Sequence, residues 1–191
     1  QSQYKVPQIS ELPEFNGGLV GYFGYEIIRY IEPKLANLKQ TDELSIADIL
    51  LMVSNDLVVF DNLFNKAFLI THIDPSEYSF DDAQIRLSEI EKQIDKPLNQ
   101  AQYQSDNLTS DDFISSFGEK NFKNVVKDIQ KYIIAGDVMQ VVPSQRLSAD
   151  FKAPPIELYR RLRRLNPSPY MYYLDLDGVS IVGSSPEILT R

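Results

Sequence analysis

The clearest pattern in the chain is a pair of segments, residues 79–94 and 122–133, in which apolar residues recur at helical spacing. Such spacing puts the apolar side chains on one face and predicts two amphipathic helices. The first segment opens with Ser79 followed three residues later by Asp82, which is typical of a capping box. The second is followed by Gly136, a residue free to take the positive φ that helix C-termini favour.

A third helix is expected from Pro154-Pro155 to Leu165, because proline is favoured in the first turn of a helix. Its inward positions are apolar: Ile156, Tyr159 and Leu162. Other positions of this helix form a basic cluster: Arg160, Arg161, Arg163 and Arg164. We interpret the cluster as a solvated face, favoured near the helix C-terminus by the helix dipole. The alternative is a site for a carboxylate or phosphate ligand.

Short apolar runs bounded by turn residues predict β-strands. A Gly-rich strand over residues 18–25 is followed by a short helix that ends before Pro33. Residues 49–60 and 67–73 predict a pair of strands joined by a longer loop.

Two further strand predictions concern the C-terminal part of the chain. Residues 138–147 predict a strand, in which Pro143 implies a sheet edge or a bulge because proline has no N–H to donate. Residues 170–176 and 179–182 predict a hairpin around an Asp-Gly turn.

Turns connect adjacent strands more often than helices do, which favours an α+β fold with helices on the outer faces of antiparallel sheets.

Residues 96–115 include a stretch rich in Asn, Gln, Ser, Asp and Thr, which predicts a linker. The chain is therefore divided into residues 1–95, the linker 96–115, and residues 116–191.

Composition narrows the classes of function. A net charge of −8 disfavours binding to nucleic acid or to anionic membranes. The absence of cysteine excludes disulfides and thiolate chemistry, and it fits a reducing cytoplasm. No run of about 18 apolar residues is present, so no membrane span is expected.

The single histidine and a group of four glycines are expected to be structural. His72 is the only histidine, and without cysteine it cannot form a catalytic triad or a metal site, so no metal ligand is assigned in this chain. Gly17, Gly18, Gly21 and Gly24 do not have the G-x-G-x-x-G spacing of dinucleotide sites. We expect them to permit close backbone approach or a bulge in a strand.

Glu187 follows Ser184-Ser185-Pro186 at the end of the last predicted hairpin. A carboxyl group held beside a proline turn is well placed to act as a general acid. From the spacing alone, a surface or capping glutamate is the simpler interpretation. The residues by themselves therefore predict an α+β domain and leave its role open.

The order of several segments adds information: residues 18–33, 132–137, 140–146, 159–171 and the Gly-Ser-Ser-Pro-Glu of residues 183–187. In this order and at this spacing they resemble the anthranilate synthase component I family. The resemblance implies two antiparallel β-sheets packed face to face with outer helices, incomplete in this chain. It also implies that residues 1–95 are part of the N-terminal region and residues 116–191 the first part of the chorismate-binding domain.

The family's reaction is the conversion of chorismate and ammonia to anthranilate and pyruvate in tryptophan biosynthesis. The resemblance implies Mg²⁺ as cofactor and a glutamine amidotransferase subunit, component II, as the source of ammonia. Glu187 matches the family's general acid, which acts on the departing C4 hydroxyl of chorismate. This role needs a carboxyl group with a raised pKa, through burial or a nearby like charge.

Two further assignments follow from the resemblance. Gln140 lies where water-using relatives carry a lysine; an amide cannot serve as that base, but it can hydrogen-bond near incoming ammonia. The alternative for Gln140 is a hydrogen-bonded glutamine inside a strand. Pro169, Tyr170 and Met171 match a segment that helps bind tryptophan, the feedback inhibitor, and an aromatic ring and a thioether can line an indole pocket. The alternative is that these three residues belong to the core of a strand.

The family's catalytic histidine, its Mg²⁺-binding glutamates and its chorismate carboxylate site are expected beyond Arg191. The start of the chain, Gln1, has no initiator methionine, so the true beginning is expected upstream. We therefore expect the isolated chain to be inactive. Two alternatives stay open: aminodeoxychorismate synthase component I, against which Met171 argues, and a non-catalytic module that binds a ligand or subunit.

Overall fold

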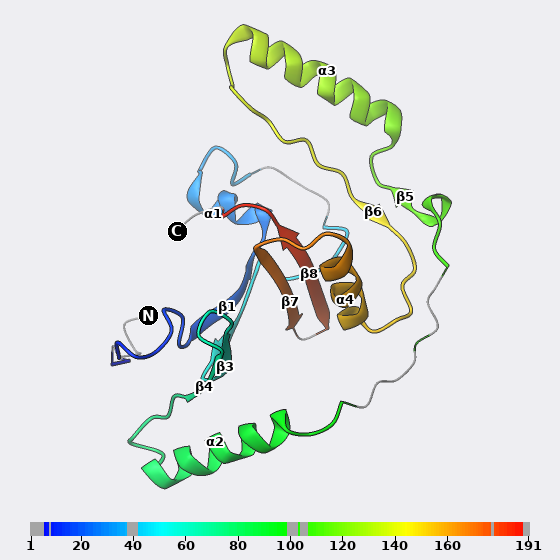
Figure 1. The fold of residues 1–191 in the computed structure, drawn as a ribbon. Coiled ribbons are helices and arrows are strands. Elements are labelled where there is room, and N and C mark those ends of the chain that lie inside the picture. Colours follow the sequence, from blue (N-terminus) through cyan, green and yellow to red (C-terminus); the bar gives the residue numbers. More distant parts are fainter. Residues whose placement is uncertain are drawn as a thin grey trace. The chain divides into compact units, whose positions relative to one another are not determined.

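The computed structural model describes residues 6–7, 9–37, 42–98, 103, 107–176 and 178–188. The chain divides into two compact units, Gln1–Gln100 with Ser168–Arg191, and Ala101–Pro167. Figure 1 shows helices together with short antiparallel strand pairs in the chain. The α+β class and the antiparallel pairing predicted from the sequence are therefore confirmed.

The first unit begins with an antiparallel pair of strands, β1 (Gly18–Phe23) and β2 (Ile49–Ser54). A short helical segment lies between them in sequence, formed by η1 (Tyr25–Ile27) and α1 (Ile28–Ile31), and it ends before Pro33 as predicted. Gly21 lies directly opposite Leu51, and a Cβ on Gly21 would overlap the carbonyl group of Leu50. The expected close backbone approach is confirmed at this glycine.

The single strand predicted over residues 49–60 is wrong, because the structure divides it at Asn55. The second half is β3 (Asp56–Asp61), which pairs with β4 (Lys66–Thr71) rather than with β1. The backbone changes its hydrogen-bonding partner at Asn55, whose carbonyl oxygen accepts from the backbone N–H of His72 at 2.8 Å. Two short ladders therefore replace one long strand.

Helix α2 (Phe80–Ile94) begins with the predicted capping box. The Asp82 N–H donates to the Ser79 hydroxyl oxygen at 3.2 Å, and the Ser79 N–H donates to the Asp82 carboxylate at 2.8 Å. Ala83 is buried on the apolar face of the helix, and α2 packs against β4. The cap and the apolar face together fix where this helix starts and which side faces the hairpin.

This capping box leads to a prediction about acid stability. Hydrogen bonds from the Ser79 side chain and backbone lower the pKa of Asp82 from its ordinary value of 3.8. The stabilisation is therefore complete above the unfolded-state pKa and is lost as the pH falls through the folded-state pKa. We expect Asp82→Asn to melt at a lower temperature than wild type at neutral pH, and this gap to narrow as the pH falls below 3.8, the ordinary pKa of aspartate.

Thermal melts monitored by circular dichroism across this pH range measure the gap. Asp81→Asn, one position along the same helix turn, is the matched control, since Asp81 is not a member of the box. A gap for Asp82→Asn that stays constant with pH would contradict the assignment.

The second unit contains η2 (Ser110–Asp112), β5 (Ile114–Ser115), α3 (Glu119–Ala135), β6 (Leu147–Ser148) and α4 (Pro155–Leu165). Gly136 ends α3 with a φ of 82°, as the sequence predicts. The four arginines of α4 are exposed, in agreement with a solvated face.

The strand predicted over residues 138–147 is wrong except at Leu147. Leu147 and Ser148 pair with Ile114 and Ser115, whereas residues 138–146 have no regular structure. Pro143 removes one backbone donor from this segment. Among the described residues, no strand lies beside it to complete a ladder.

The last elements return to the first unit: β7 (Tyr170–Leu176) and β8 (Val179–Ser185) form the predicted hairpin. The Asp of its turn, Asp177, lies outside the described residues, as does part of the predicted linker 96–115. The apolar side chains buried in the described part of the chain are Ile70, Ala83 and Leu176. In the same residues, no helix combines the length and apolar character that crossing a membrane requires.

Candidate functional site

Glu187 lies just beyond the end of β8, where its backbone is held by a neighbouring side chain. The Ser185 hydroxyl donates to the Glu187 carbonyl oxygen at 2.8 Å, and the Glu187 N–H lies 3.5 Å from the same hydroxyl oxygen. Pro186 stands between the two residues and fixes its own φ near −65°. The Glu187 side chain itself is exposed, so the described residues do not supply the burial that an acid role calls for.

The residues expected to bind an inhibitor lie at the same end of the hairpin. Tyr170 is directly opposite Ser185, and Met171 is directly opposite Ser184, at the open end of the β7–β8 pair (Figure 1). Directly opposed residues in antiparallel strands have Cβ atoms about 5 Å apart. The structure thus brings the segment of Pro169, Tyr170 and Met171 close to the backbone that carries Glu187.

Two further features of this hairpin end were not predicted from the sequence. The Tyr172 ring lies across Gly183, its partner in the ladder, and a Cβ on Gly183 would overlap that ring. Just before β7, the Ser168 hydroxyl is buried and makes no hydrogen bond in the described structure. Buried polar atoms normally have a partner, which can be an ordered water, a ligand or further polypeptide.

Gln140 belongs to the second unit, Ala101–Pro167. It lies exposed in the irregular segment 138–146, next to Met139, whose side chain is 97% exposed. The alternative of a glutamine inside a strand therefore does not apply in this structure. Its expected role near ammonia stays a prediction.

Comparison with known proteins adds decisive information to this geometry. Residues 2–191 match the model of the family described as chorismate binding enzyme. The chain belongs to this chorismate-binding enzyme family. The expectation drawn from the ordered motifs is thus confirmed at the level of the family.

Relatives of this chain include proteins named anthranilate synthase component 1. The anthranilate synthase component 1 of Pseudomonas putida is 47% identical over 195 residues, covering 100% of this chain and 40% of the relative. A probable anthranilate synthase component 1 of Schizosaccharomyces pombe is 32% identical, covering 99% of this chain and 40% of the relative. The chain therefore spans about 40% of the length of such relatives.

A solved structure supports the fold. Anthranilate synthase component I from Streptococcus pneumoniae TIGR4 matches with a TM-score of 0.79 and 31% identity, over 96% of this chain and 41% of that chain. The similarity of fold to anthranilate synthase component I is thereby confirmed for this member of the family.

His72 has a structural contact with the segment before β1. Its Nε2 lies 2.5 Å from the carbonyl oxygen of Asn16, so this nitrogen is the donor. A Cβ on Gly17 would come within 2.6 Å of the same nitrogen, so the imidazole lies directly against the backbone of this segment. The contact ties the residues before β1 to the end of β4, in agreement with the structural role predicted for His72.

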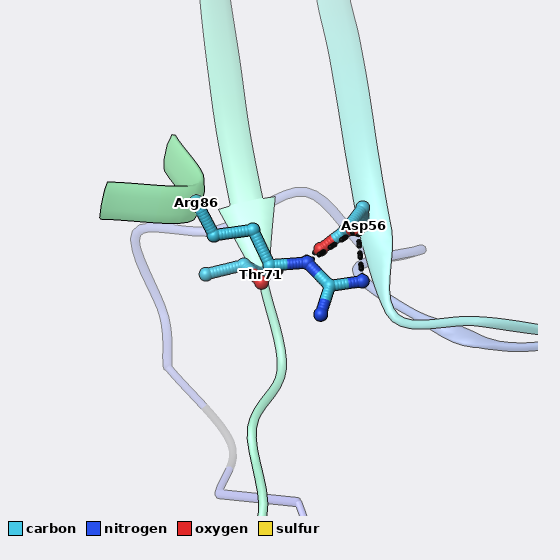
Figure 2. A network of polar contacts seen from close by, with 3 residues as sticks. All are labelled: Asp56, Thr71 and Arg86. Atoms are coloured by element: carbon cyan, nitrogen blue, oxygen red, sulfur yellow. Dashed lines mark hydrogen bonds and ion pairs between the residues drawn. The ribbon is translucent and has the colours of Figure 1, made fainter. Parts of the chain in front are cut away.

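A polar network that the sequence did not reveal ties α2 to the β3–β4 hairpin (Figure 2). Arg86 Nε and Nη2 lie 2.7 and 2.5 Å from the same Asp56 carboxylate oxygen, and the Thr71 hydroxyl donates to the other oxygen at 2.7 Å. The hydrogen bond to Asp56 raises the pKa of the Arg86 guanidinium. Both side chains of the ion pair are partly exposed, so its contribution to stability is modest.

The network borders a pocket of about 570 Å³ between α2 and the hairpin, lined among others by Tyr78, Ile85 and Glu89. Asp56 and Arg86 neutralise each other there, which makes this arrangement a structural brace rather than a reactive pair. No local sequence signal points to it, because its members come from different elements.

The described residues do not form a metal site. In the ranges that the structure covers, no group of three or more histidine, aspartate or glutamate side chains gathers closely enough to hold a metal ion. These residues therefore do not fit a Mg²⁺ site, and no chemical step is assigned to a metal here.

Proposed function

We propose that this chain is part of an anthranilate synthase component I, which converts chorismate and ammonia to anthranilate and pyruvate. The observation that carries the proposal is the position of Glu187 directly after β8, where the Ser185 hydroxyl binds the Glu187 carbonyl oxygen. The names of the relatives, which match the chain over its whole length, support the same reaction.

In this proposal Glu187 is the general acid. Hydroxide is a poor leaving group, so a carboxylic acid that protonates the C4 hydroxyl of chorismate lets it depart as water and lowers the barrier. The carboxyl group must be protonated at the start of the step, which burial around Glu187 in the complete enzyme would favour.

Gln140 distinguishes amino transfer from water transfer. Water needs a base before it attacks, whereas ammonia is already a nucleophile and needs only orientation. The Gln140 amide offers one acceptor and two donors for that purpose but cannot take up a proton. We assign Gln140 to hold ammonia near the reacting carbon, with the ammonia supplied by a glutamine amidotransferase subunit, component II.

Regulation and the cofactor belong to the same proposal. Pro169, Tyr170 and Met171 would form part of a tryptophan site at the start of β7. Mg²⁺ would be held by residues of the complete enzyme's C-terminal portion, which this chain does not contain. The enzyme would act in the cytoplasm.

The experiment that tests the proposal is an anthranilate fluorescence assay on the complete enzyme that contains this chain. The mixture holds chorismate, ammonium and Mg²⁺, with and without tryptophan. We expect anthranilate fluorescence that tryptophan suppresses. Chorismate consumption without anthranilate would indicate aminodeoxychorismate synthase component I instead, and no consumption would indicate a non-catalytic module that binds a ligand or subunit.

A further inference from the structure

The Ser185 hydroxyl is the side-chain group that the structure shows bound to the backbone of Glu187. Its short contact, 2.8 Å to the Glu187 carbonyl oxygen, has the length of a good O–H···O hydrogen bond. The contact from the Glu187 N–H is longer, 3.5 Å, and weaker. A single hydroxyl thus binds the backbone carbonyl of Glu187 and lies near its backbone N–H.

The position of Ser185 is itself fixed by the hairpin. Ser185 is the last residue of β8 and lies directly opposite Tyr170, the first residue of β7. Two residues earlier, Gly183 lies opposite Tyr172 and against its ring, which leaves no room there for a side chain. Ser185 therefore connects a rigid ladder to the residue that follows Pro186.

We propose that Ser185 is a positioning residue for the carboxyl group of Glu187, an inference that rests on the acid role in the proposed function. A general acid acts only within hydrogen-bond reach of the atom that it protonates. Without the hydroxyl, the peptide of Glu187 is free to rotate after Pro186, and the carboxyl group spends less time in that position. Misplacement of a catalytic group by about 1 Å lowers rates by up to about 100-fold.

The test compares three variants in the complete enzyme by steady-state kinetics of anthranilate formation. Ser185→Ala is expected to lower kcat about 10-fold with KM for chorismate little changed, because the placement of the acid is altered and substrate binding is not. Ser185→Thr keeps a hydroxyl and is expected to recover most of kcat.

Ser180→Ala is the matched control. Its hydroxyl also lies on β8 and donates to the Asp175 carboxylate at 3.2 Å, far along the hairpin from Glu187. We expect Ser180→Ala to leave kcat unchanged. The thermal midpoints of the two alanine variants show whether a loss of hairpin stability explains a difference in kcat between them.

The outcomes separate the two proposals. If wild type forms anthranilate and Ser185→Ala behaves like Ser180→Ala, or changes KM alone, the positioning role is wrong and the proposed function stands. If wild type forms no anthranilate, the proposed function fails and the positioning role falls with it.

Discussion

Replacing Glu187 with glutamine is expected to lower kcat of the complete enzyme by about 10²–10⁴-fold, the usual contribution of a general acid. Glutamine has the same length and can still hydrogen-bond, but its amide N–H protons are not acidic enough to act as a general acid at neutral pH. Chorismate affinity should stay close to that of wild type, because the effect lies in the transition state. Steady-state kinetics and calorimetric titration with chorismate measure the two quantities.

Glu91→Gln provides the comparison for this experiment. Glu91 is an exposed glutamate on α2, outside the hairpin that carries Glu187, so the same chemical change there should leave kcat unaltered. A Glu187→Gln enzyme with near-normal kcat would rule out the acid role. A variant that loses chorismate binding instead would show that Glu187 holds the substrate rather than protonating it.

The helices of this chain were predictable because their signals are local. The Ser79–Asp82 box and the αL glycine at Gly136 both act within one helical turn, and both occur in the structure as predicted. The proline at the start of α4 is a third such signal. Each depends only on residues a few positions apart, which a single sequence displays directly.

The strands were less predictable because a strand is defined by its partner. Residues 49–60 are apolar except for Ser54, Asn55 and Asp56. These three polar residues mark the division, but they do not show that the first half pairs with β1 and the second with β4. Residues 138–146 have the apolar character of a strand, yet in the described structure they have no ladder to join. Pairing over long sequence separations decides both cases, and composition does not encode it.

The candidate site shows the same difference between local signals, which the sequence displays, and contacts that depend on the fold. The sequence predicted that Glu187 follows a hairpin and that Tyr170 begins it, since the turn between them is a local signal. It did not predict the hydroxyl contact of Ser185 with the Glu187 backbone, because a serine before proline has many available partners. The Arg86–Asp56 brace was missed because its two residues are 30 positions apart.

Gly21→Ala is expected to lower the free energy of unfolding by about 3 kcal/mol, at the upper end of what overpacking by one methyl group produces. Gly21 lies within the β1–β2 ladder, where an added Cβ would overlap the carbonyl group of Leu50. That obstacle is backbone and cannot rotate away as a side chain can. The two strands must separate locally, which weakens the hydrogen bonds on either side. Urea unfolding monitored by circular dichroism measures the loss.

Gly136→Ala is the control that separates steric overlap from backbone strain. Gly136 ends α3 with a φ of 82°, and a Cβ there would meet no atom within 4 Å. Alanine at this position carries only the strain of the left-handed conformation, about 1 kcal/mol. Gly21, by contrast, has no positive φ, so its effect comes from the approach of the strands. A larger loss of stability for Gly21→Ala would establish that this glycine sets the distance between β1 and β2. Equal losses for the two variants would mean that the two strands lie further apart in solution than in the structure.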